Sequence, residues 1–221
     1  MRTKYLARLG GIAAVVAAAL LWLVPARAQP RVFDPPGPGV ASAAAADDTA
    51  PAPMTAMAAG STLTRQLAQA RLATAKYATN LARAKADGYQ VITPMMPDMG
   101  IHYMNPGIQG FTIAKPQILV YEHHGNTWQL GALEWVFPSM PRTPPLPNAT
   151  FGSFPAACHY KDGTFIPEEN SKTCQKTSPK TGSTFSSWHP DLTTMHVWIW
   201  YPNPAGLYSS TNPLVAPFNG G

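Results

Sequence analysis

The chain has 221 residues, with 16 Lys and Arg against 11 Asp and Glu and a sequence pI of about 9.3. Four of the 16 cations, Arg2, Lys4, Arg8 and Arg27, lie within residues 1–28 and no acid does, which leaves 12 cations against 11 acids. The high pI therefore reflects the N-terminal segment. Because no basic run is interleaved with aromatic residues, we expect no nucleic-acid partner.

Residues 1–28 have the pattern of a cleavable signal peptide. A basic start is followed by an apolar run over residues 12–24 and by Ala26-Arg27-Ala28, a small-x-small cleavage sequence. The alternative is a retained membrane anchor, but this apolar run is short for a span, which needs about 20 residues. We therefore expect a periplasmic or secreted bacterial protein with no stable membrane span after cleavage.

The two cysteines, Cys158 and Cys174, fit an oxidising compartment. The chain has no CxxC motif and no second pair, so a single disulfide is the favoured interpretation. Closing a loop of roughly 15 residues stabilises a fold by about 3 kcal/mol in the chain-entropy model. The alternative is a pair of thiolates that bind a metal.

The composition divides the rest of the chain in two. Residues 29–60 are rich in Ala, Pro and Gly, which predicts a disordered linker, and residues 61–221 are expected to form one domain. That domain begins with apolar and small residues at alternating spacings of four and three, which predict a long amphipathic helix packed on a sheet, with a coiled coil as the alternative. These positions are Leu63, Leu67, Ala70, Thr74, Tyr77, Leu81 and Ala84.

Strand patterns follow Gly88. Residues 118–122 and 129–137 predict two strands with a hairpin turn at 124–126, and residues 194–201 predict a third. The stretch 138–192 is rich in Pro, Gly, Ser and Thr, and we expect a long loop excursion stapled by the disulfide. The predicted fold class is α+β, with one long N-terminal amphipathic helix on an antiparallel sheet.

No standard catalytic motif is present, so the chemistry has to be sought in His and Glu. Glu134 and His196 lie inside apolar strands, where a polar side chain needs a partner if it is buried. His102 is a third candidate. Two imidazoles and a carboxylate suit Zn, Cu or non-haem Fe, so these three residues are a candidate site for a divalent transition metal. The sequence does not decide whether the protein is an enzyme.

Other polar residues have weaker claims to a function. His159 and His189, in the predicted excursion, could close over the same place, whereas His123 and His124 are expected to be solvated turn residues. A solvent-facing Glu134 and a structural His196 are the simpler alternatives. Four methionines around His102 raise the possibility of copper, although such residues more often fill a core. They are Met95, Met96, Met99 and Met104.

Two other functions stay open. The first is a non-catalytic module that binds a small ligand or a glycan in an aromatic pocket. The second is a metal-free enzyme in which Glu134 and His196 exchange protons. The pocket of the first alternative would be formed by Tyr103, Trp135, Trp198 and Trp200.

Several segments resemble a family of secreted bacterial proteins. These are Ala86-Asp87-Gly88-Tyr89, MGIHYMNP at 99–106, LVYE at 119–122, LGALEWVFP at 130–138 and MHVWIWYPNPAGLYSSTNP at 195–213. The family's pattern is similar to GY…GMGIHYVNP…LLYE…LVGVEYVVP…LHVWLW..NPAGMF..FNP. The resemblance implies motif positions for His102, Glu134 and His196, and likewise for Tyr103, Asn105, Asn203 and Gly206, but it implies no activity.

The chain departs from this pattern in two places. Where the family often has a Cys soon after the GY, this chain has Val91-Ile92-Thr93-Pro94. Where members tend to show Phe-His-Gly, it has Cys158-His159. The disulfide would therefore be particular to this branch, and His159 is the least secure correspondence.

Overall fold

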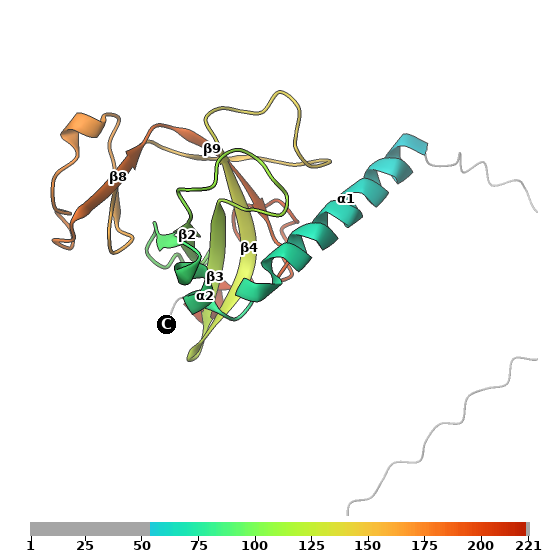
Figure 1. Ribbon diagram of the computed structural model, residues 1–221, viewed down its shortest axis with the longest axis horizontal. Coiled ribbons are helices and arrows are strands. Elements are labelled where there is room, and N and C mark those ends of the chain that lie inside the picture. The colour runs from blue at the N-terminus through green and yellow to red at the C-terminus, as the bar shows by residue number, and fades with distance from the viewer. Residues whose placement is uncertain (1–53, 220–221) are drawn as a thin grey trace, which may run out of the picture. The chain divides into compact units, whose positions relative to one another are not determined.

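Two antiparallel β-sheets contain most of the regular structure in residues 54–219, which are the residues that the computed structural model describes (Figure 1). The predicted signal peptide and residues 29–53 of the predicted linker lie outside the described residues. Helix α1 (Met54–Thr74) begins within the last residues of that linker segment.

The first sheet has six strands in the order β1-β2-β3-β4-β9-β5. The predicted hairpin is present, with Gly125 and Asn126 forming the turn between β3 and β4. The predicted third strand is present as β9, which ends earlier than expected. The strands are β1 (Gln90–Val91), β2 (Ile101–Met104), β3 (Ile118–His124), β4 (Thr127–Phe137), β5 (Gly152–Phe154) and β9 (Leu192–Val197).

Both faces of this sheet are buried at its centre. Because side chains alternate along a strand, Leu133 and Trp135 of β4 enter the main apolar core, which also includes Ala70 at the end of α1. Ala132 of β4 packs on the other face in a smaller apolar cluster with Val120. The polar candidates Glu134 and His196 lie on this second face.

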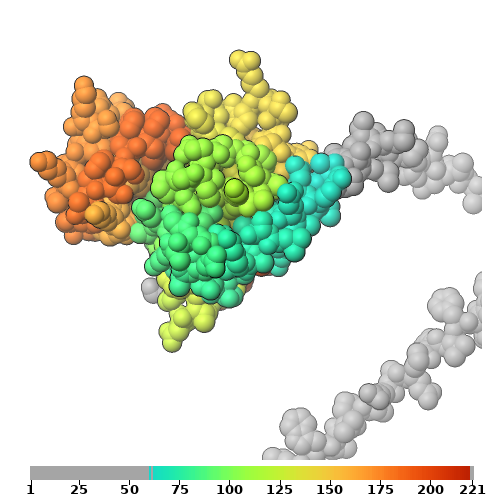
Figure 2. Space-filling model, viewed as in Figure 1, coloured from blue at the N-terminus to red at the C-terminus, as the bar shows by residue number. Residues whose placement is uncertain are grey.

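The stretch after β5 forms a second sheet of three strands in the order β7-β6-β8. The disulfide between Cys158 and Cys174 is present, as predicted, and ties β6 to the residue that follows the short 3-10 helix η2 (Ser171–Thr173). Figure 2 shows this part of the chain, in orange, beside the green segment around residues 90–115. The strands are β6 (Ala157–Tyr160), β7 (Phe165–Pro167) and β8 (Phe185–His189).

The predicted fold class is therefore wrong. The described residues are mostly β, with two antiparallel sheets, and the expected loop excursion contains the second of them. Nor does one long helix cover the first sheet: in Figure 1 α1 extends away from it, and among the α1 side chains that the structure describes, the buried ones are Ala70 and Thr74, near its C-terminal end.

The periodicity of apolar residues predicted one continuous helix, but the chain interrupts it after Thr74. A 3-10 turn, η1 (Ala75–Tyr77), follows α1, and the Asn80 side chain then caps a separate short helix, α2 (Leu81–Ala86), by accepting a hydrogen bond from the Arg83 amide. A last short helix, α3, covers Ala216–Asn219. Among the described residues, no helix has the length and apolarity needed to cross a membrane.

Candidate metal centre

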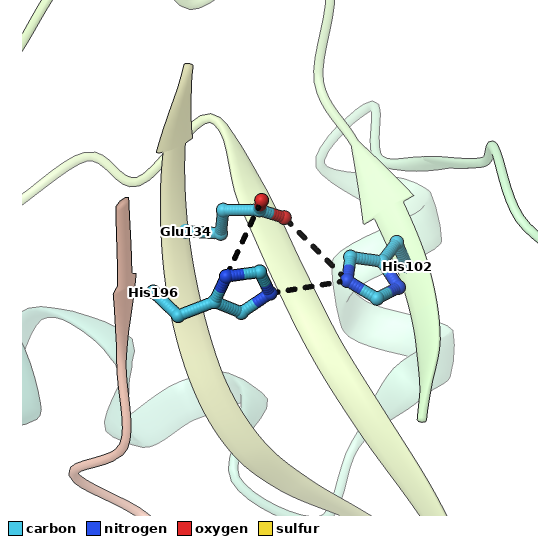
Figure 3. Close-up of side chains that lie close together, drawn as sticks. All are labelled: His102, Glu134 and His196. Atoms are coloured by element: carbon cyan, nitrogen blue, oxygen red, sulfur yellow. Dashed lines mark hydrogen bonds and ion pairs between the residues drawn. The ribbon is translucent and has the colours of Figure 1, made fainter. Parts of the chain in front are cut away.

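Three strands of the first sheet bring His102, Glu134 and His196 together on one face (Figure 3). Glu134 of β4 and His196 of β9 are direct cross-strand partners. His102 comes from β2, on the far side of β3, where it pairs with Val120. The three candidate ligands thus converge, and their convergence depends on pairings between segments that are distant in the sequence.

The three side chains point at one another at similar distances. His102 Nε2 lies 3.4 Å from His196 Nε2 and 3.5 Å from Glu134 Oε2, and His196 Nδ1 lies 3.6 Å from Glu134 Oε1. These separations are longer than ordinary hydrogen bonds. Two ligand atoms at 2.0–2.1 Å from a tetrahedral ion lie about 3.3 Å apart. His196 turns a different nitrogen toward each partner, and one atom from each of the three residues lies within 4.8 Å of the others, so the side chains would have to approach slightly to hold one ion.

Burial sets the protonation of the cluster. His102, Glu134 and His196 are each only 4–5% exposed. Desolvation raises the pKa of Glu134 to about 8, and the Thr194 hydroxyl, bonded to the carboxylate, partly opposes this rise. Burial lowers the pKa of His196 to about 4. It also lowers that of His102 well below its usual value, with the charge of His196 adding to the effect.

The pKa directions mean that the metal-free cluster is neutral near pH 7, with Glu134 protonated and both imidazoles uncharged. A buried cation would change this balance because it stabilises an ionised carboxylate and needs the unprotonated imidazole nitrogens. Ion binding would therefore release the Glu134 proton.

Thr93 fixes the orientation of His102. Its Oγ1 accepts a hydrogen bond from the His102 backbone amide at 3.0 Å and lies 3.2 Å from Nδ1 of the same residue. When Nδ1 carries the ring proton and donates it to Thr93, the Nε2 lone pair is directed at the centre of the cluster. Metal-binding histidines usually have such a partner on the other nitrogen.

A cavity of about 270 Å³ adjoins the three residues. Its walls come from both sheets and from the loop before β2, so it lies between the two sheets. An ion held by three protein groups keeps a coordination position open, as catalytic zinc sites do. Here the open side would face the cavity. The other lining residues are Ile92, Thr93, Met96, Met99, Ile118, Ser153, Phe154, Pro155, Phe165, Thr194 and Ser210.

The other predicted histidines do not join the site. His159 and His189 lie on the second sheet with ring centroids 5.0 Å apart, and His159 Nδ1 is 2.8 Å from the Ile92 carbonyl oxygen. Phe154 and Phe165, which do line the cavity, contact His159. The two histidines thus support the cavity wall from outside.

His124 is not simply a solvated turn residue. Its Nε2 is 3.0 Å from Oε2 of the fully buried Glu122, and its ring stacks on Phe218. His123 packs against Trp128. Among the methionines near His102, only Met96 and Met99 line the cavity.

The structure does not assemble the predicted aromatic pocket. Tyr103, Trp135 and Trp200 belong to or pack against the main core, on the face away from His102. Trp198 packs in the smaller cluster with Val120, and none of the four lines the cavity. Its aromatic wall is formed by Phe154 and Phe165, which have no periodic pattern that marks them. Thr194 could have been predicted, since alternation places it on the face of His196.

Comparison with protein families, curated proteins and solved structures finds no match for this chain. A function can therefore be inferred only from the chemistry of the site itself.

Proposed function

We propose that this chain is an exported protein that binds one divalent transition-metal ion through His102, Glu134 and His196. The observation that carries the proposal is the convergence of two imidazoles and a carboxylate, all buried, within 4.8 Å of one another. Burying three ionisable groups is costly unless they have partners. An ion at their centre would satisfy all three at once.

The donor set favours Zn or Fe(II). Two histidines and one carboxylate are the protein ligands of several catalytic zinc sites and also of the non-haem Fe(II) oxygenases. Cu(I) is less favoured because the soft thioether donors that it prefers, Met96 and Met99, lie in the cavity wall rather than in the cluster. With an open position facing the cavity, the bound ion would be placed to act on a small molecule.

One observation favours a second candidate. Glu134, with its pKa near 8, lies 3.6 Å from His196, a pairing that could transfer protons without a metal. The same cavity would then hold the substrate. This function requires that the purified protein be active with no ion present.

Export is supported by the disulfide, since such bonds persist in oxidising compartments. The N-terminal sequence pattern agrees with it. We also place the chain with the secreted bacterial proteins it resembles, because His102, Glu134 and His196 occupy the family's motif positions.

The test is metal analysis of untagged protein purified from the periplasm of a bacterial host. We expect about one equivalent of Zn or Fe per chain, as a three-ligand site holds one ion. His102→Ala, Glu134→Ala and His196→Ala should each lose it. His123→Ala is the matched control, since it removes a half-buried imidazole outside the cluster. Folded wild-type protein that binds no Zn, Fe or Cu when each is added would overturn the proposal.

A further inference from the structure

The walls of the cavity are mainly apolar, whereas the cluster at its floor is polar. Glu134 is the only acidic residue among those lining it, and no Lys, Arg or Asp is included. Most of the lining beyond the cluster is aliphatic, thioether or aromatic, with Ile118, Met99 and Phe154 as examples. A ligand in this space therefore meets apolar surface on most sides.

The volume limits the ligand's size. An apolar cavity of about 150 Å³ is enough to bind benzene. The present cavity, at about 270 Å³, is larger than that. It therefore has room for a molecule of one to two small rings.

The cavity has a buried end and an exposed end. His102, Glu134 and His196 are buried at the floor, whereas Ser153, Pro155 and other exposed residues mark the way out. Ser210 is also exposed and belongs to this outer set. A molecule that enters here must pass an apolar space before it reaches the cluster.

From these features we propose that the cavity binds a small, uncharged and mainly apolar molecule of one to two rings beside the His102/Glu134/His196 cluster. This deepens the proposed function, on which it rests, by naming the class of molecule that a bound ion would meet. Sugars, amino acids and phosphate esters fit poorly. Each would bury several polar or charged groups against walls that offer no charged partner, which is unfavourable.

Indole is a suitable probe because it is uncharged, apolar and soluble, and tryptophan is its charged counterpart with the same ring system. Equilibrium dialysis of both, and of glucose, would use the periplasmic protein in its metal-loaded and chelator-treated forms. We expect indole to bind both forms, and tryptophan and glucose to bind at least about tenfold more weakly.

Two variants locate the binding. Met99→Trp should fill the cavity and weaken indole binding at least about tenfold, because the new tryptophan side chain would occupy the space that free indole needs. Met140→Trp is its matched control, because Met140 is 59% exposed and lies outside the cavity. Ser153→Trp, on an exposed position of edge strand β5, narrows the entrance and covers the case in which Met99→Trp does not fold.

The outcomes separate this inference from the metal proposal. Indole binding that is lost in Met99→Trp or Ser153→Trp but kept in Met140→Trp supports the inference. It does so even if no metal is found, in which case the metal proposal alone fails. Absent indole binding, equal binding of tryptophan, or equal binding by all variants would overturn the inference, whatever the metal content.

Discussion

Glu134 and His196 face each other across strands β4 and β9, so that His196 presents one ring nitrogen to a carboxylate and the other to a second imidazole. Its Nδ1 lies 3.6 Å from Glu134 Oε1, and its Nε2 lies 3.4 Å from His102 Nε2. Register between the two strands fixes this pairing, and a shift by one residue would move His196 to the other face. The site is therefore a property of the sheet rather than of a loop.

The stability of the metal-free protein should fall as pH rises from about 6.5 to 8. The pKa of Glu134 is raised from 4.5 in the unfolded chain to about 8 in the folded protein. In this pH range the folded protein therefore holds a proton on Glu134 that is released on unfolding. The expected loss is of the order of 1–2 kcal/mol. Below pH 6.5 the trend reverses, because the pKa values of His102, His196 and His159 are lowered by burial, and the unfolded chain takes up more protons on these three residues than it loses from Glu134. Urea denaturation of chelator-treated protein at several pH values measures both slopes.

Glu134→Gln is the control for this titration, since it keeps the shape of the side chain and removes its titratable proton. Its stability should change little between pH 6.5 and 8. Metal-loaded wild-type protein should lack this falling slope, because Glu134 is ionised both in the metal-bound site and in the unfolded chain. If the stability of Glu134→Gln still fell between pH 6.5 and 8, a group other than Glu134 would be responsible for the effect.

Replacing Thr93 should weaken metal binding without removing a ligand. Thr93→Val loses the oxygen that holds the His102 amide and ring, and loss of such a supporting partner typically costs about 10–100-fold in metal affinity. Thr93→Ser keeps the hydroxyl and should restore most of the affinity. Competition with a chelator of known affinity measures the change. Equal affinities for Val and Ser would show that the hydroxyl is not used.

The disulfide should stabilise the fold without being needed for the ion. Cys158 and Cys174 lie on the second sheet and its adjoining segment, while all three cluster residues lie on the first sheet. Replacing both cysteines with Ser should lower the free energy of unfolding by about 2–4 kcal/mol. Metal content at 25 °C should stay unchanged. Loss of the ion from a variant that is still folded would contradict this separation.

Gly131 should not tolerate a side chain. A Cβ there would collide with Oε1 of the buried Glu122 and would approach the Trp198 ring to 3.2 Å. Gly131→Ala is expected to destabilise the protein by about 1–3 kcal/mol through overpacking. Gly60→Ala is the contrasting variant: it lies in helix α1 with no neighbour near a new Cβ, and should be neutral or slightly stabilising. Thermal denaturation compares the two.

The sequence predicted the parts of the fold that depend on local alternation. Strands β3 and β4 have long apolar runs around a two-residue turn, and His196 lies in an apolar strand, so their positions were recognisable. The site residues followed from the same reasoning, since a Glu and a His stand out in apolar strands. Their convergence was not predictable, because His102 reaches them only across β3.

The errors have physical causes as well. The second sheet was missed because its strands are only three to five residues long and lie among turn-forming residues. The long helix was overestimated because periodicity continues through η1, whereas Asn80 starts a new helix. The prediction of an aromatic pocket did not take into account that side chains alternate between the two faces of a strand. Tyr103 follows His102 directly, so the two side chains cannot lie on the same face of β2.

The most direct test of the metal centre is X-ray absorption spectroscopy of the protein loaded with one equivalent of Zn. We expect about two imidazole ligands and a carboxylate oxygen, with nitrogen and oxygen scatterers at 2.0–2.2 Å. Replacing His102 or His196 should remove this signal, because each variant loses the ion. Sulfur scatterers at about 2.3 Å, or a spectrum without imidazole contributions, would contradict this expectation.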